Sequence, residues 1–181
     1  AGADWVTAYT NIQTALDAAL DNSTIYLAGR TFAISNRLSW AGKSGVHLLG
    51  GYEAVPGSEP GNCDPAQWPT VVLRTGGGYS RLMLINQVAS GLLARVTFSG
   101  GNLYDDGGGL RIINSSLEID NCVVSSNTVR GGANVYMKGG GIYAIGSTVD
   151  LRNSVLRENT VSGEAPAWNG AAFVAGSGIP M

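Results

Sequence analysis

The chain contains an internal repeat, and this feature constrains its fold more than any other. Residues 108–129 and 140–161 align without a gap at an offset of 32, which is 140 minus 108. Both copies begin with a glycine pair and end in Asn-Thr-Val. A partial third copy starts at Gly170 with an offset of 30, and a degenerate earlier copy at 92–102 parallels 117–127 with an offset of 25. Repeats of this kind are typical of solenoid proteins.

Each copy holds two or three short segments in which apolar and polar residues alternate, separated by Gly or Asn corners. One copy cannot bury its apolar face alone. Stacked copies can, because each strand then pairs in parallel with its equivalent about 4.8 Å away. Asparagine tolerates the left-handed backbone of a corner, and stacked asparagines can hydrogen-bond to one another. We expect two such ladders, Asn127 with Asn159 and Asn121 with Asn153. The pattern predicts an all-β chain folded as a parallel β-helix.

The composition excludes several classes of protein. Of the 181 residues, 27 are glycine and 13% are charged, with a formal charge of −2. A nucleic-acid-binding protein needs a basic stripe and a membrane span needs about 18–20 apolar residues in a row, and the sequence has neither. Two cysteines and one histidine do not make a disulfide framework or a zinc site. We therefore expect Cys122 to be a small buried side chain, Cys63 to be unpaired, and no cofactor to be bound.

The N-terminal residues predict a cap for one end of the stack. Thr10 and Gln13 fit a helix capping box, and the apolar residues around them share one helical face: Ile12, Ala15, Leu16, Ala19 and Leu20. We expect this helix to run to about Asp21. Residues 1–23 then cap a single domain whose coils occupy residues 24–181.

Strand-like segments follow the cap at 24–28, 46–49, 71–73 and 82–85. Between them, residues 53–69 carry four of the six prolines and are expected to form a long loop. The sequence breaks off in the middle of a repeat copy. This predicts either the front part of a longer solenoid or an open end that a partner or a second copy covers.

The start of the chain resembles that of many bacterial surface β-helix proteins. The residues that carry the resemblance are Trp5 to Leu16, followed by Ile25 to Gly29 and then by Leu48 to Tyr52. The later Gly-Gly-Leu/Ile and x-x-Asn spacing is similar to the polymorphic outer-membrane-protein repeats, within the pectate-lyase-like right-handed β-helix class. Those repeats carry Phe-x-x-Asn, whereas Val124 and Leu156 replace the phenylalanine here. The resemblance implies a right-handed β-helix, secreted or displayed on a cell surface, that is used in adhesion or glycan contact.

Two pairs of carboxylates are candidate catalytic residues. The offset of 32 places Glu118 over Asp150 on adjacent coils, about 5 Å apart, which suits a retaining glycosidase. Repulsion in such a pair raises one pKa, as a general acid requires. The alternative is an exposed, solvated pair without catalytic function, which is common in solenoids. Asp105 and Asp106 precede a glycine run and fit an acidic catalytic loop, a calcium loop or an ordinary turn. The Gly-Gly-x-Gly-x-Asp calcium motif is absent, so no metal is expected.

Two rows of outward side chains also follow from the alignment. The offset of 25 predicts a solvated ladder of alternating charge: Arg95, Asp120 and Arg152. The strands after the glycine pairs predict a row of flat side chains that could bind a ligand such as a sugar: Arg111, Tyr143 and Phe173. Tryptophans in loops can serve the same purpose, and three have loop-like surroundings: Trp40, Trp68 and Trp168.

Three functions are compatible with these observations. The first is a non-enzymatic structural or adhesive module, secreted or on the cell surface, that contacts glycans or host proteins. The second is a glycan- or glycoprotein-degrading hydrolase that uses Glu118 and Asp150. The third is a passive spacer. Neither nucleic acid nor a membrane span enters any of these, while end-to-end or lateral self-association is compatible with all three.

Overall fold

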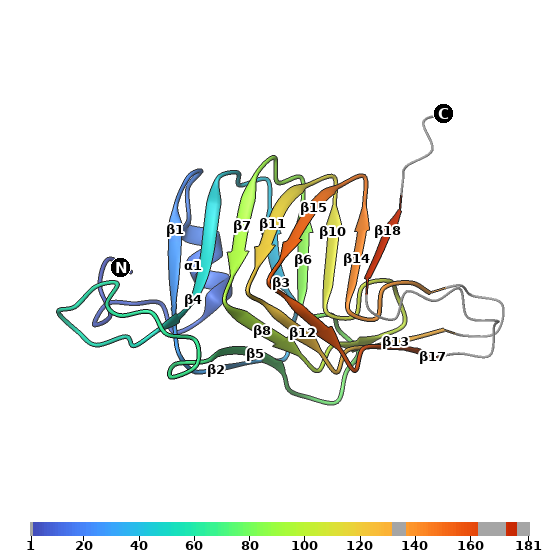
Figure 1. Ribbon diagram of the computed structural model, residues 1–181, viewed down its shortest axis with the longest axis horizontal. Coiled ribbons are helices and arrows are strands. Elements are labelled where there is room, and N and C mark those ends of the chain that lie inside the picture. The colour runs from blue at the N-terminus through green and yellow to red at the C-terminus, as the bar shows by residue number, and fades with distance from the viewer. Residues whose placement is uncertain (1, 132–136, 163–172, 177–181) are drawn as a thin grey trace.

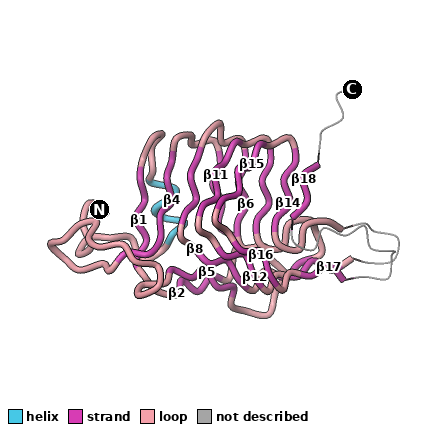
Figure 2. The backbone as a smooth tube through the Cα atoms, viewed as in Figure 1, coloured by secondary structure: helices cyan, strands magenta, loops and turns pink. Residues whose placement is uncertain are grey.

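The computed structural model of the protein describes residues 2–131, 137–162 and 173–176 (Figure 1). These residues form one short helix and many short strands joined by turns (Figure 2). In chain order the elements are α1 (Ile12–Ala18), β1 (Thr24–Ala28), β2 (Thr31–Ile34), β3 (Leu38–Ala41), β4 (Val46–Tyr52), β5 (Thr70–Arg74), β6 (Met83–Asn86), β7 (Gly91–Ala94), β8 (Val96–Ser99), β9 (Asn102–Leu103), β10 (Leu110–Ile113), β11 (Ser116–Asp120), β12 (Val123–Ser125), β13 (Thr128–Arg130), β14 (Ile142–Ile145), β15 (Thr148–Arg152), β16 (Val155–Arg157), β17 (Thr160–Ser162) and β18 (Phe173–Gly176).

The strands form four parallel sheets. Sheet A contains β1-β4-β7-β11-β15, sheet B contains β2-β5-β8-β12-β16, sheet C contains β3-β6-β10-β14-β18, and sheet D contains β9-β13-β17. The chain visits sheets A, B and C in turn, and from β9 onward it adds a strand of sheet D between B and C. We call one such passage a circuit. Each strand pairs in parallel with its equivalent in the next circuit (Figure 1), which confirms the prediction of an all-β chain with parallel strands.

The repeat offset of 32 is the register between the last two full circuits. Glu118 lies opposite Asp150, for example, and 150 minus 118 is 32. The offset to the preceding circuit is 26 rather than the predicted 25, because Phe98 lies opposite Val124 and 124 minus 98 is 26. The sequence alignment matched polar corner residues, whereas the strands align the apolar residues that they bury. Because side chains alternate between faces, an error of one residue places every side chain on the wrong face.

For this reason the predicted charge ladder is wrong at Arg95, whereas Asp120 does lie opposite Arg152 as predicted. Asp120 lies opposite Ala94, not opposite Arg95. Arg95 occupies the corner after β7 with a φ of 58°, and its Nε donates to the carbonyl of Gly50 at 3.0 Å. Arg152, the third member of the expected ladder, forms ion pairs with Glu118 and Asp150.

The apolar residues that alternate along the strands fill one core between sheets A, B and C. Trp40 belongs to this core, because it lies on β3 and is almost completely buried, whereas the sequence suggested a loop. Its indole N–H donates to the carbonyl of Lys43 at 2.8 Å. On the neighbouring β7, a Cβ at Gly91 would come within 2.6 Å of the Trp40 ring, so glycine makes room for the indole. Trp168 lies outside the described residues.

Asn127 and Asn159 form the predicted ladder inside the stack. Asn127 is completely buried, and its Nδ2 donates to Asn159 Oδ1 at 3.0 Å and to the carbonyl of Phe98 at 3.3 Å. Its Oδ1 accepts the N–H of Gly101 at 2.8 Å. One amide thus joins three successive circuits.

The second predicted ladder does not form. Asn121 and Asn153 are exposed at corners, with φ values of 50° and 47°. Asn153 Nδ2 donates to Asp120 Oδ1 at 2.8 Å rather than to Asn121. The two asparagines share a left-handed backbone, as expected, but their side chains do not bond to one another.

The helix α1 is shorter than predicted. Its N-cap is Asn11 rather than Thr10, because the Asn11 side chain accepts the N–H of Gln13 at 2.7 Å. The helix ends at Ala18, and Leu20, which was expected on its apolar face, is exposed. Of the apolar residues within the helix, Ile12 and Leu16 are buried in the core.

Gln13 seals the free edge of sheet C. The backbone N–H of Ser39 on β3 donates to Gln13 Oε1 at 2.7 Å, and Gln13 Nε2 donates to the Ser39 carbonyl at 3.0 Å. The side-chain amide therefore pairs with β3 as a neighbouring strand would. Ile12 and Leu16 of the same helix are buried in the core.

Both cysteines are free thiols. Cys122 is buried, as expected, and burial raises the pKa of its thiol to about 11. Within the part of the chain that the structure describes, no helix has the length and apolar character needed to cross a membrane.

Candidate functional site

Glu118 and Asp150 lie side by side on β11 and β15, as predicted. Both point away from the core, because Leu117 and Ile119 on either side of Glu118 are buried. Arg152 lies on the same strand as Asp150, and its Nε donates to Asp150 Oδ2 at 2.9 Å. The same guanidinium places Nη1 3.5 Å from Glu118 Oε1. One arginine therefore bridges both carboxylates.

Arg152 determines the charge state of this group. Its hydrogen bond lowers the pKa of Asp150, and Asp150 in turn raises the pKa of Arg152. The expectation that repulsion raises a pKa is therefore wrong for Asp150, because the guanidinium compensates the repulsion. A carboxyl group with a lowered pKa is ionised at neutral pH and has no proton to donate. The arrangement is that of an exposed ion-pair network.

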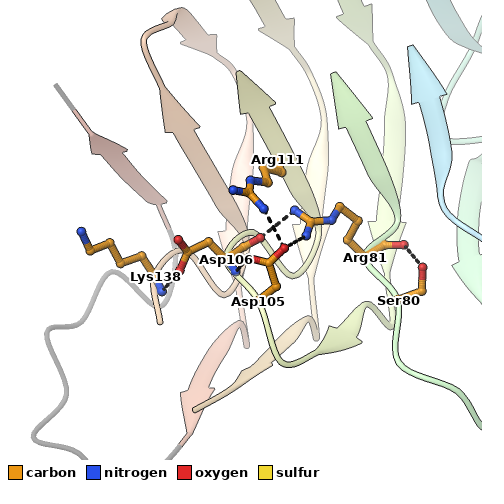
Figure 3. Close-up of polar contacts among 6 residues, drawn as sticks. All are labelled: Ser80, Arg81, Asp105, Asp106, Arg111 and Lys138. Carbon is orange, nitrogen blue, oxygen red and sulfur yellow. Dashed lines mark hydrogen bonds and ion pairs between the residues drawn. The ribbon is translucent and has the colours of Figure 1, made fainter. Parts of the chain in front are cut away.

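Asp105 is the centre of a second charged cluster, on the turn between β9 and β10 (Figure 3). Its Oδ2 accepts hydrogen bonds from two guanidinium groups, that of Arg81 and that of Arg111, the latter at 2.6 Å. Arg81 is only 4% exposed, and its Nη1 also donates to the carbonyl of Asp106 at 2.7 Å. We call Arg81, Asp105 and Arg111 the Asp105 cluster. It brings together an expected catalytic residue, Asp105, and an expected ligand-binding residue, Arg111, that no sequence pattern connects.

Asp106 ties two circuits together. Its Oδ1 accepts the backbone N–H of Lys138 at 2.6 Å, across the turns that precede β10 and β14 (Figure 3). Partial burial raises the pKa of Asp106, and the hydrogen bond from Lys138 opposes that shift. Both carboxylates of the loop thus make contacts that hold the turn. Among the described residues, no group of three or more His, Cys, Asp or Glu side chains could hold a metal ion.

We predict that the two aspartates titrate on opposite sides of the ordinary aspartate pKa of about 3.9. Asp150 is expected below this value because Arg152 stabilises its charge, and Asp106 above it because burial disfavours its charge. Carboxyl carbon chemical shifts, followed by NMR from pH 2 to pH 7, measure both midpoints in one sample.

The control for this titration is Arg152→Gln. It should raise the midpoint of Asp150 toward the ordinary value and leave that of Asp106 unchanged. An Asp150 midpoint above that of Asp106 in the parent chain would reject the assignment and restore Asp150 as a candidate general acid.

The predicted row of Arg111, Tyr143 and Phe173 is wrong in two respects. Arg111 does lie opposite Tyr143, but Tyr143 is only 6% exposed and its ring centroid lies 6.0 Å from the Arg111 guanidinium. Phe173 lies opposite Ile142, because the offset here is 31, which is 173 minus 142, and not 30. Ile142 is buried, so Phe173 follows an inward column. The three residues do not form one outward aromatic row.

Two exposed tyrosines beside the Asp105 cluster escaped the sequence analysis. Tyr79 and Tyr104 are 60% and 52% exposed, and their ring centroids lie 4.6 Å apart in an edge-to-face arrangement. An antiparallel bridge joins their loops, with hydrogen bonds of 2.7 and 3.0 Å between the backbones of Ser80 and Asn102. A signal was present, since each tyrosine lies close to a run of three glycines.

Tyr104 directly follows β9 of sheet D, and polar side chains of this sheet lie next to β9. Arg130 Nε donates to Asn102 Oδ1 at 2.8 Å, and Thr128 lies opposite Asn102 in the sheet. Tyr79 raises the pKa of Tyr104, and the charge of Arg130 acts in the opposite direction. We call Tyr79, Tyr104, Asn102, Arg130 and Thr128 the tyrosine site. It combines exposed aromatic rings, a guanidinium, an amide and a hydroxyl on one surface.

Comparisons of the chain with protein-family models, with curated proteins and with solved structures found no match.

Proposed function

We propose that the chain is a right-handed parallel β-helix module, secreted or displayed on a cell surface, and that it binds glycans without cleaving them. The cyclic strand order, the parallel registers and the buried asparagine ladder support this architecture. The resemblance of the first 52 residues to bacterial surface proteins supports the location.

The tyrosine site is the observation that carries the proposal. Sugars present apolar C–H faces and dense hydroxyl groups, so they bind where aromatic rings lie beside hydrogen-bonding side chains. Tyr79 and Tyr104 supply the rings, while Asn102, Arg130 and Thr128 supply donors and acceptors. The positive charge of Arg130 favours a glycan that carries carboxylate or sulfate groups.

The engagement of the predicted catalytic residues argues against a hydrolase. Arg152 pairs with Glu118 and Asp150, while Asp105 is held by two arginines. Asp106, whose pKa is raised, accepts a backbone hydrogen bond that fixes the turn. A passive spacer, in turn, gives no reason for an exposed pair of tyrosines.

The test is binding of the chain to immobilised mucins, acidic polysaccharides and plant glycans. We expect binding to acidic members, and about a tenfold loss of affinity in the Tyr79→Ala/Tyr104→Ala variant, since stacking contacts and apolar burial are lost together. The matched control is Tyr26→Ala, which removes another exposed tyrosine that packs edge-to-face on Tyr52.

Absence of binding by the folded chain would reject the proposal, and so would equal binding by parent and double variant. The same panel in solution, read by mass spectrometry, should release no products. Products that the parent releases and Glu118→Gln/Asp150→Asn does not would instead establish a hydrolase.

A further inference from the structure

A cleft of about 600 Å³ lies at the β1 end of the molecule. The N-terminal segment before α1, the helix itself and strand β1 form its walls, and Figure 1 shows these elements together at that end. Neither the carboxylate pairs nor the tyrosine site contributes to its lining. Its volume falls in the range of ligand sites. The cleft is therefore a second candidate binding site, separate from the tyrosine site.

One wall of the cleft is a free sheet edge. β1 is the first strand of sheet A and pairs only with β4. The N–H of His47 donates to the carbonyl of Ser23, and Thr24 lies opposite His47. Backbone groups alternate in direction along a strand, so Thr24 and Tyr26 direct their N–H and C=O groups away from β4 and toward the cleft. Among the described residues, nothing hydrogen-bonds to these four groups.

The edge strand β3 differs from β1 in that its outward backbone groups have partners. β3 is the corresponding edge of sheet C, and there the Gln13 side chain binds both the N–H and the C=O of Ser39. The cap thus seals one edge at this end of the stack and leaves the β1 edge open within a cleft. An open edge of this kind is a template for one more strand.

The side chains around the edge indicate what that strand carries. Trp5 lines the cleft, and its indole N–H is buried and has no acceptor among the described residues. Asp4 and Glu59 line the same cleft. The hydroxyl and the backbone N–H of Thr7 lower the pKa of Asp4, and backbone N–H groups lower that of Glu59, so both are ionised at neutral pH. Two carboxylates with backbone partners attract a cationic side chain.

We propose that this cleft binds an extended peptide segment that carries a lysine or arginine, and that the segment adds to sheet A as a parallel or antiparallel strand against β1. The backbone of the peptide pairs with Thr24 and Tyr26, one of its carbonyls accepts the Trp5 indole N–H, and its basic side chain lies by Asp4 and Glu59. This is strand addition, in which main-chain hydrogen bonds give affinity and side-chain contacts give selectivity.

The probe is a phage-displayed library of random octapeptides, panned against the intact 181-residue chain. We expect enrichment of proline-poor peptides with a lysine or arginine. The enriched peptide, synthesised with a fluorescent label, gives dissociation constants by anisotropy.

Two variants test the contacts of the peptide. Thr24→Pro removes one outward N–H and should weaken binding about tenfold, and Asp4→Asn should weaken it about fivefold. Hydrogen exchange at the Thr24 and Tyr26 amides should slow on binding.

The matched control is Thr31→Pro. Thr31 also begins an edge strand and also directs its N–H away from its partner, since Val71 N–H donates to the Arg30 carbonyl, but it does not line the cleft. The Thr31→Pro variant should leave peptide affinity unchanged.

Trp5→Phe provides a second test that leaves the strand intact, with an expected loss of peptide affinity of about fivefold. Failure to enrich any peptide, or enriched peptides that bind Thr24→Pro, Asp4→Asn and Trp5→Phe as well as the parent, would overturn the proposal.

Discussion

Replacing Asn127 with alanine is expected to lower the free energy of unfolding by about 3 kcal/mol. Asn127 is completely buried, so water cannot replace the lost hydrogen bonds. The substitution leaves the N–H of Gly101 and the carbonyl of Phe98 without this partner and removes a donor to Asn159 Oδ1. Each buried group left unsatisfied costs about 1–3 kcal/mol. Urea unfolding followed by circular dichroism measures the difference.

Asn121→Gly is the control for this experiment. Asn121 is exposed at a corner with a φ of 50°, which glycine adopts without strain, so the change in stability should stay within about 0.5 kcal/mol. A loss below about 1 kcal/mol in Asn127→Ala, or an equal loss in both variants, would show that the ladder does not stabilise the stack.

The sequence repeat correctly predicted those strand pairings that lie between circuits of matching length. The two repeat copies pair at a constant offset of 32, so aligning their letters also aligned their strands. The pairing of Glu118 with Asp150 and the Asn127 ladder followed from that alignment. The preceding circuit is six residues shorter, since 32 minus 26 is 6. In that circuit the corner residues matched at an offset of 25 residues. The strands instead pair at an offset of 26, which places the buried Phe98 opposite Val124. Packing of the apolar column fixes the register, and corner residues adapt to it.

The candidate sites, too, could be predicted only where their residues follow the repeat pattern. The identity of the outward carboxylates followed from alternation along the strand, but the approach of Arg152 to both of them depends on how a long side chain folds back. Tyr79 and Tyr104 are 25 residues apart in sequence, which is 104 minus 79, and belong to no repeat copy in common. The bridge between Ser80, in an irregular loop, and Asn102, at the start of β9, brings their rings together. Contacts of that kind have no period for a sequence pattern to reveal.

The loop that carries Tyr104 depends on a buried arginine, and an Arg81→Met variant is expected to lose about 2–3 kcal/mol of unfolding free energy. Arg81 is 4% exposed, and methionine fills similar space without the charge. The carbonyl of Asp106 loses its donor from Arg81, and Asp105 keeps the guanidinium of Arg111 and the backbone N–H of Asp106. The expected loss lies below that of a fully buried ion pair because the Asp105 side chain is about half exposed and water solvates it. Chemical denaturation measures the change.

Arg111→Met separates this effect from the loss of a surface charge. Arg111 donates to the same Asp105 oxygen but is more exposed, so its replacement should cost less than about 1 kcal/mol. Arg81→Met should also weaken glycan binding at the tyrosine site, because Asp105 and Asp106 follow Tyr104 directly and Arg81 holds both. Equal losses in the two variants would assign the stability to charge alone. Full glycan affinity in a destabilised Arg81→Met chain would show that the Asp105 cluster supports the stack without positioning the tyrosines.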